Sequence, residues 1–239
     1  HDGAEARRAA EWALRHFDAV NLDLIYALPH ATPADAARDA ALAARLGVGH
    51  VSAYQLTLEP GTAFHRQPPP LPDDDGAYAM QQAVTETLEG AGLTRYETAA
   101  FARAGEECRH NLNYWRFGDY LGIGAGAHGK LSFPDRVERE ERPRQPAAYM
   151  EAALAGTLAP KTRVLDARDL ALEFMMNALR LTAGVEAELF AARTGLALDA
   201  LAVPLRRARA RGLLEADPRA LRPTPRGRDF LNELLQEFV

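Results

Sequence analysis

The sequence predicts an α/β protein in which a parallel sheet precedes a small helical module. In the first part of the chain, amphipathic helical segments alternate with strand-like ones, which is the order of βα units. From Asp166 onward the pattern is mainly helical. With 239 residues, of which 47% are hydrophobic, the chain is long enough for one large or two modest domains.

The chain opens with a helix, a strand and a second helix. Apolar residues fall at helical spacing within Ala4–Phe17, so we expect an amphipathic helix there. Val20–Tyr26 alternates apolar and polar residues with the period of a strand. Thr32 can cap a helix that has Pro33 at its first position and continues over Ala34–Leu46.

Asp23 is the most informative residue of the first strand. Asn21 and Asp23 lie on its polar face, which in a parallel sheet or barrel looks into the space where ligands sit. Because burying an unpaired charge is costly, Asp23 should either contact a ligand or pair with a Lys or Arg. The sequence leaves both alternatives open.

The next elements continue the alternation. A strand is expected over His50–Thr57, and Gln55 near its carboxyl end is a candidate ligand contact, although polar residues also gather where a chain surfaces. The aspartates from Asp73 precede a helical pattern over Tyr78–Leu88, so we favour a helix cap over a cation site. Tyr96–Phe101 reads as a short strand.

The stretch from Cys108 to Gly129 concentrates the residues that could carry chemistry. It begins with a thiol and an imidazole, continues with amides and aromatic rings, and then alternates glycine with apolar residues over Leu121–His128. This period predicts a strand with one nearly bare face. Because glycine weakens a strand, either a flat ligand or a bulge or closely packed helix should account for that face.

The remaining segments predict a connection and a winged-helix-like module. We expect a charged linker with a bridging helix over 134–162 and a separate domain over 163–239. In that domain we expect helices over Val185–Arg193 and Asp199–Arg211, a hairpin of Leu213–Glu215 with Ala220–Arg222, and a last helix from Thr224 to Phe238.

Composition excludes several classes of protein. The net charge is −5, so nothing global indicates a nucleic-acid or membrane partner, although arginines cluster between Val203 and Arg228. A single cysteine excludes a disulfide framework and a multi-cysteine zinc site, and it fits the reducing cytoplasm. No apolar run reaches membrane-spanning length.

Several motifs together resemble one known family. Asn21 to Pro29, Tyr54 to Thr62, Leu71 to Asp75 and His110 to Gly129 follow one another in the order of its signatures, and Thr224 to Gly227 matches the start of its last helix. The chain is thus similar to the HemW-type heme chaperones, radical-SAM proteins of the oxygen-independent coproporphyrinogen III oxidase-like family.

The resemblance implies a fold, cofactors and site residues. It implies that 1–133 is the C-terminal part of a partial TIM-type (βα) radical-SAM barrel with a heme-motif strand. It also implies binding of S-adenosylmethionine (SAM) and a [4Fe-4S] cluster. In such proteins the equivalent of Asp23 contacts SAM, and the motif formed here by His110, Asn111 and Tyr114 is tied to heme binding.

The residues themselves agree with part of this. His110 can supply an axial nitrogen to heme iron, and Cys108 is an alternative or second ligand. We expect the neighbouring aromatic rings, Asn113, and the glycine face with Gly124 and Gly126 to form the bed of a flat macrocycle.

One feature of the family is missing from the chain. The Cys-x-x-x-Cys-x-x-Cys motif that holds the cluster is absent, and Cys108 alone cannot hold one. We therefore expect the cluster ligands, with the first half of the barrel, to lie upstream of His1.

Three functions remain as hypotheses. The first is a cytoplasmic heme chaperone that delivers heme to an acceptor protein, with a homodimer left open. The second is an oxygen-independent coproporphyrinogen III oxidase. The third is a winged-helix nucleic-acid binder, which the balanced charge of the last domain disfavours.

Overall fold

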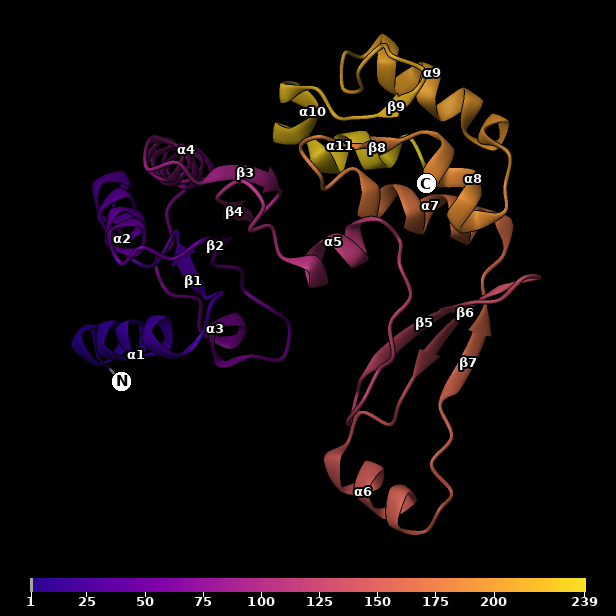
Figure 1. Ribbon diagram of the computed structural model, residues 1–239, viewed down its shortest axis with the longest axis horizontal. Coiled ribbons are helices and arrows are strands. Elements are labelled where there is room, and N and C mark those ends of the chain that lie inside the picture. Colours follow the sequence, from indigo (N-terminus) through magenta and orange to yellow (C-terminus); the bar gives the residue numbers. More distant parts are fainter. Residues whose placement is uncertain (1) are drawn as a thin grey trace. The chain divides into compact units, whose positions relative to one another are not determined.

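The computed structural model describes residues 2–239 and divides the chain into two units, one ending at Cys108 and the other spanning Arg109–Val239. The sequence predicted the main boundary near residue 133. In the structure the second unit begins at Arg109, and it therefore contains His110, Asn111 and Tyr114 of the heme motif. Figure 1 labels the elements of both units.

The first unit alternates helices and strands as predicted through its second strand, after which two helices and then two strands follow one another. Its elements are α1 (Gly3–His16), β1 (Asn21–Tyr26), α2 (Pro33–Arg45), β2 (His50–Gln55), α3 (Ala63–Arg66), α4 (Asp74–Gly90), β3 (Thr94–Glu97) and β4 (Ala100–Ala102).

Side-chain caps set the starts of the helices in this unit. Asp73 accepts a hydrogen bond from the amide of Gly76 at 2.8 Å, which confirms the predicted cap of α4. Thr32 and Asp35 form a reciprocal capping box at the start of α2.

The sheet of the first unit has the strand order β1-β2-β4-β3. β1 and β2 pair in parallel, with Asp23 opposite Ser52 in register. The predicted single strand Tyr96–Phe101 is instead two antiparallel strands, because the chain reverses at Thr98 and Ala99. This turn lacks the glycine or asparagine that marks most two-residue hairpin loops, so the sequence pattern did not reveal it.

α2 and α4 cover the apolar face of this sheet. Ala40, Val51, Met80 and Leu88 are buried in the core that they share. The apolar face of β1 packs against this core and Tyr26 is buried, as the alternation predicted. The polar face of β1 remains outside the core.

The second unit combines a sheet with a helical module. Its elements are α5 (Arg109–Trp115), β5 (His128–Ser132), β6 (Val137–Glu141), α6 (Pro146–Leu154), β7 (Lys161–Val164), α7 (Ala167–Ala178), β8 (Val185–Glu186), α8 (Glu188–Thr194), a 3₁₀ helix η1 (Leu198–Leu201), α9 (Ala202–Ala210), β9 (Ala220–Leu221), α10 (Pro225–Asp229) and α11 (Leu231–Gln236).

The stretch 134–162 is more ordered than the predicted linker. β6 pairs antiparallel with both β5 and β7, and α6 lies at the end of this sheet away from α7 (Figure 1). The sequence did not predict β6, because its residues after Val137 are all charged and show no apolar alternation.

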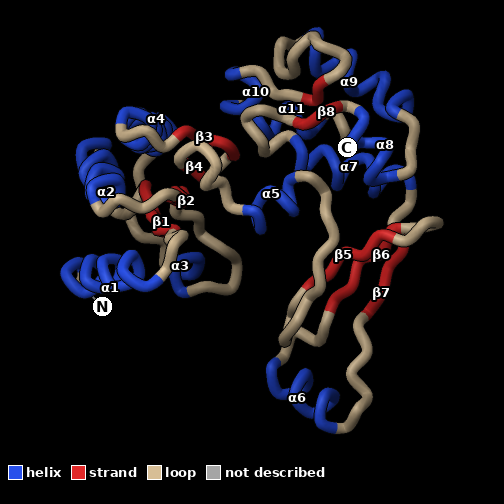
Figure 2. Tube along the Cα trace, viewed as in Figure 1, coloured by secondary structure: helices blue, strands red, loops and turns tan. Residues whose placement is uncertain are grey.

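The predicted strand over Leu121–His128 is wrong over most of its length. The segment is a loop, drawn in tan between α5 and β5 in Figure 2, and a strand begins only at His128. Gly124 and Gly126 have φ values of 104° and 71°, so these glycines serve backbone conformations that other residues rarely adopt.

The C-terminal module differs from its prediction in three details. β9 pairs with β8, at a position predicted to be helical, and the expected hairpin is reduced to one bridge between Leu214 and Pro223. The last helix is broken at Phe230 into α10 and α11.

In residues 2–239 we find no helix that has both the length and the apolar character needed to span a membrane.

Candidate functional site

α5 brings the predicted heme-motif residues onto one helical face. His110 and Tyr114 are four positions apart, and their ring centroids lie 4.8 Å apart in a T-shaped arrangement. The ring of Tyr114 in turn lies 4.3 Å from that of Tyr120. His110 itself is exposed, so its imidazole is accessible to a ligand.

Buried aromatic residues fix α5 to the core of the second unit. Phe117 is 1% exposed and its ring lies 5.7 Å from that of Phe174 on α7. Arg180 lies over the ring of Trp115 at 4.4 Å. Phe117 therefore belongs to the core, which corrects our expectation that all the aromatic rings after His110 would line a macrocycle.

A buried lysine holds the chain just after α5. Lys130 is 1% exposed and donates hydrogen bonds to Asp119 Oδ1 at 2.8 Å, to Ser132 Oγ at 3.0 Å and to the carbonyl of Phe117 at 3.1 Å. Burial lowers the pKa of Lys130. Burial also acts to raise the pKa of Asp119, but hydrogen bonds from Lys130 and Ser132 outweigh it and keep that pKa below its usual value.

The two asparagines of the motif have different surroundings. Asn113 donates from Nδ2 to the backbone carbonyl of Asp119 at 2.9 Å. Its own backbone carbonyl accepts a hydrogen bond from the amide of Gly118 at 2.7 Å. It therefore closes the loop after α5. Asn111 is half-buried.

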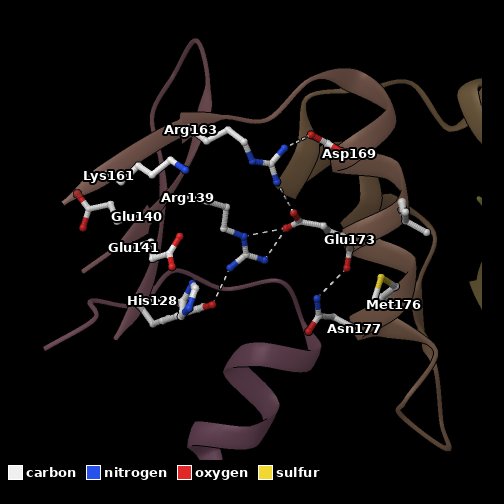
Figure 3. Close-up of a pocket in the computed structure, with 12 residues that line it drawn as sticks. His128, Arg139, Glu140, Glu141, Lys161, Arg163, Asp169, Glu173, Met176 and Asn177 are labelled. Carbon is white, nitrogen blue, oxygen red and sulfur yellow. Dashed lines mark hydrogen bonds and ion pairs between the residues drawn. The ribbon is translucent and has the colours of Figure 1, made fainter. Parts of the chain in front are cut away.

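A cavity of about 660 Å³ lies between the β5-β6-β7 sheet and α7. Tyr120 and His128 line it together with charged residues of β6 and β7, and Leu172 and Met176 of α7 add apolar surface (Figure 3). Through Tyr120, this cavity adjoins the row of rings that begins at His110.

Ion pairs neutralise much of the charge around the cavity. Arg139 donates to Glu173 from both Nε, at 2.8 Å, and Nη2, at 2.5 Å, and its Nη1 donates to the hydroxyl of Tyr120 at 2.6 Å. Arg163 pairs with Asp169 and Glu173 (Figure 3). The tyrosine next to this network is affected too, since burial and nearby Tyr120 raise the pKa of Tyr114.

The glycine loop does not form the bare wall that we expected. A Cβ on Gly122 would meet the backbone carbonyl of His128, so this glycine allows the chain to approach itself. Gly124 faces open space, and Gly126 lies near the backbone of Arg144. Only Gly124 thus remains open to a ligand.

The predicted SAM contact lies in a polar cluster of the first unit. Asp23 is exposed, and its Oδ1 accepts a hydrogen bond from Asn21 Nδ2 at 2.8 Å. Asn21 Oδ1 lies 2.7 Å from His50 Nδ1, and Ser52 Oγ donates to it at 3.1 Å. His50 Nε2 lies 2.8 Å from the hydroxyl of Tyr96. An accessible carboxylate held in this way suits a ligand with hydroxyl or amine donors.

Gln55, the other predicted ligand contact in this sheet, lies on the opposite face from Asp23. Gln55 ends β2 opposite Tyr26 in register, so strand alternation places it on the other face of the sheet from Ser52 and Asp23. Cys108 is half-buried at the end of the unit.

The residues present cannot hold an iron–sulfur cluster. Over residues 2–239 no group of three or more His, Cys, Asp or Glu side chains is placed to bind a metal ion, and Cys108 is the single cysteine. Thiolates normally supply the ligands of such clusters, so residues 2–239 contain no site for one.

At least three arginines of the cluster between Val203 and Arg228 are engaged within the module. Arg211 pairs with Glu233 and Glu237, Arg219 pairs with Asp217, and Arg209 donates to backbone carbonyls. These contacts compete with the phosphate contacts that a duplex-binding surface needs.

Sequence reasoning missed several residues around both sites. Arg139 lay in a stretch read as linker, and Lys130 gave no sign of burial. His50 could have been found, since it alternates with Ser52 on the strand predicted to pair beside Asn21 and Asp23.

The chain is similar to known proteins along its whole length. HemW heme chaperones of Escherichia coli K12 and Haemophilus influenzae are 42% and 39% identical to it over 100% of the chain, and 63% and 62% of their own lengths are covered. The heme chaperone HemW of Bacillus subtilis is 31% identical, with 93% of the chain and 59% of that protein covered.

A domain family and a solved structure agree with these relatives. The HemN C-terminal domain matches residues 165–230. A structure of coproporphyrinogen III oxidase (HemN) from Escherichia coli, described as a radical SAM enzyme, matches with a TM-score of 0.79 at 19% identity, covering 100% of this chain and 59% of that one. The chain has the fold of that part of HemN.

The chain is therefore homologous over its full length to the HemW-type heme chaperones, and it spans about three fifths of the length of these relatives.

Proposed function

We propose that the protein is a heme chaperone that binds heme as cargo through His110 and passes it to an acceptor protein in the cytoplasm. The observation that carries the proposal is the exposed imidazole of His110, which contacts the ring of Tyr114 and, through it, the ring of Tyr120 that lines a cavity. Imidazole nitrogen is a common axial ligand of heme iron.

The loop after Tyr120 offers apolar surface for the macrocycle. Leu121 and Ile123 are 68% and 84% exposed, so their apolar side chains are accessible to a ligand. The cavity adds the apolar side chains of Leu172 and Met176. These features replace the glycine face as the support for a flat ligand.

Heme titration followed by the Soret band tests this proposal. His110→Ala should weaken heme binding about tenfold or more, equal to about 1.4 kcal/mol, because the axial nitrogen is lost. Cys108→Ala tests the alternative ligand in the same way. His65→Ala, at an exposed histidine of α3, is the control, and an unchanged Soret band in His110→Ala would remove His110 from the site.

We also propose that Asp23 contacts SAM in the whole protein. When bound, SAM and a reduced cluster supply one-electron chemistry, and the cluster ligands come from residues outside this chain. The role of this chain is to hold SAM, because the carboxylate of Asp23 is accessible and is oriented by its hydrogen bond from Asn21. Loss of SAM affinity in Asp23→Asn is the expected result.

A second candidate function is favoured by the likeness to the HemN fold. An oxygen-independent coproporphyrinogen III oxidase would release carbon dioxide from the propionates of its substrate. Assaying the full-length protein for coproporphyrinogen decarboxylation separates the two, because a chaperone binds heme without this turnover.

A further inference from the structure

A hydrogen-bonded row of side chains crosses the polar face of the first unit and ends on the carboxylate of Asp23. The hydroxyl of Tyr96 lies 2.8 Å from Nε2 of His50, and Nδ1 of His50 lies 2.7 Å from Oδ1 of Asn21. Nδ2 of Asn21 then donates to Oδ1 of Asp23 at 2.8 Å. Three strands, β3, β2 and β1, contribute to the row.

The acceptors in the row fix the direction of each hydrogen bond. A carboxylate and an amide oxygen only accept, so Asn21 turns its NH₂ group to Asp23 and its oxygen to His50. Nδ1 of His50 therefore carries the proton. In the neutral imidazole Nε2 is then an acceptor, and the hydroxyl of Tyr96 donates to it. Every donor in the row thus points toward Asp23.

The inner part of the row is buried and its outer end is exposed. His50 and Ser52 are 6% and 3% exposed, whereas Asn21 and Asp23 are exposed. Burial lowers the pKa of His50 against the opposite pull of Asp23 and Glu107, so the imidazole stays neutral at neutral pH. A buried support beneath an accessible carboxylate is the arrangement that holds a ligand contact in one orientation.

We propose that His50 and Asn21 are positioning residues that hold the Asp23 carboxylate in the orientation in which it binds the hydroxyl or amine donors of SAM. This inference rests on the proposed SAM site and adds the residues that shape it. Tyr96 and Ser52 complete the support by fixing the tautomer of His50 and the side-chain amide of Asn21.

Two amide substitutions of His50 test the direction of the row. His50→Asn places an amide N–H near the position of Nδ1 and retains the donor to Asn21, whereas His50→Gln places it near Nε2 and loses that donor. We expect His50→Gln to weaken SAM binding by about three- to tenfold, the effect of one hydrogen bond, and His50→Asn by clearly less.

The measurement is the SAM dissociation constant of the full-length protein with its cluster, obtained by isothermal titration calorimetry. His65→Gln, on exposed α3, is the matched control and should bind SAM like the natural protein. If His50→Gln unfolds the protein, Tyr96→Phe serves instead, because it removes one donor and keeps the ring.

A double variant separates positioning from a general structural effect. In an Asp23→Asn background, His50→Gln should cause no further loss of SAM affinity, because its effect passes through Asp23. Nitrogen-15 NMR of the imidazole should also show the proton of His50 on Nδ1.

Each alternative result has a distinct meaning. Unchanged SAM binding in Asp23→Asn would overturn both the SAM site and the positioning role. Weak binding in Asp23→Asn with normal binding in His50→Gln would leave the site and overturn the role of His50. Additive losses in the double variant, or a proton on Nε2, would also overturn it.

Discussion

At the scale of single residues, the glycines of the loop after Tyr120 have different structural roles. Gly122 allows a backbone contact with His128, Gly124 and Gly126 allow positive φ angles, and together they do not form one wall. The regular spacing of the three glycines therefore reflects local backbone needs.

Gly122→Ala should destabilise the protein by about 1–3 kcal/mol, because the new methyl group forces two backbone segments apart. Urea unfolding of the variant measures the loss, and Gly3→Ala, where a Cβ meets open space, is the control. If the variant were fully stable but bound heme weakly, Gly122 would belong to a ligand site instead.

His50 should make the stability of the protein depend on pH. Burial keeps its pKa in the folded state below the unfolded value of about 6.5, so the unfolded state binds more protons in this range. The free energy of unfolding should therefore be highest above about pH 6.5 and should fall as the pH drops through the folded pKa. Urea midpoints between about pH 8 and pH 5 measure this trend, which should be weaker in His50→Gln.

At the scale of elements, α5 depends on contacts distant in sequence. It has only seven residues, too few for a stable isolated helix, so tertiary contacts must hold it. Phe117 and Lys130 provide these contacts, one in the aromatic core and one in a buried hydrogen-bond cluster. The position of His110 therefore depends on residues outside its motif.

Lys130→Met should lower the free energy of unfolding by about 2–3 kcal/mol, because it leaves Asp119 and the carbonyl of Phe117 without their donor. We place the loss below that of a fully buried pair, since the Asp119 side chain is 39% exposed and water can replace part of the contact. Lys161→Met, at an exposed lysine, is the control for stability alone, because Lys161 also lines the cavity. Heme binding should also weaken in Lys130→Met if the hydrogen bonds of Lys130 position α5.

The sequence predicted elements best where one apolar face packs on a core. α2, α4 and β1 were found because their apolar residues repeat with a helical or strand period. β6 was missed because its exposed charges hide the strand period, and β3 and β4 were merged because a turn without glycine gives little signal.

At the scale of the whole molecule, the chain consists of two units with separate cores. The second unit contains α5, the cavity and the C-terminal module, so the proposed heme site lies within it. The carboxylate of Asp23, for which we propose the SAM contact, lies in the first unit. Each proposed ligand therefore has its residues in one unit.

Residues 109–239 expressed alone should unfold cooperatively and bind heme, because their core and His110 are contained in that segment. Chemical denaturation and heme titration of this segment provide the measurement. A folded segment that binds no heme would place an essential ligand elsewhere, with Cys108 the first candidate to test.

The same segment should show no strongly salt-dependent binding to duplex DNA. Arg211, Arg219 and Arg209 already make contacts within the module, and these contacts compete with the release of counterions from phosphates. Fluorescence anisotropy at low and high salt tests this expectation, and affinity that falls steeply with salt would contradict it.

The sequence by itself determined the class of fold, the likeness to HemW-type heme chaperones, and the residue types of the candidate sites, because these depend on periodicity and on local motifs. Only the tertiary structure decided which of these residues meet. It joined His110 to Tyr120 and the cavity, and Asp23 to His50, because side chains far apart in sequence come together only when strands pair and helices pack. It also gave the glycines a local role, since backbone angles and close contacts cannot be read from spacing alone.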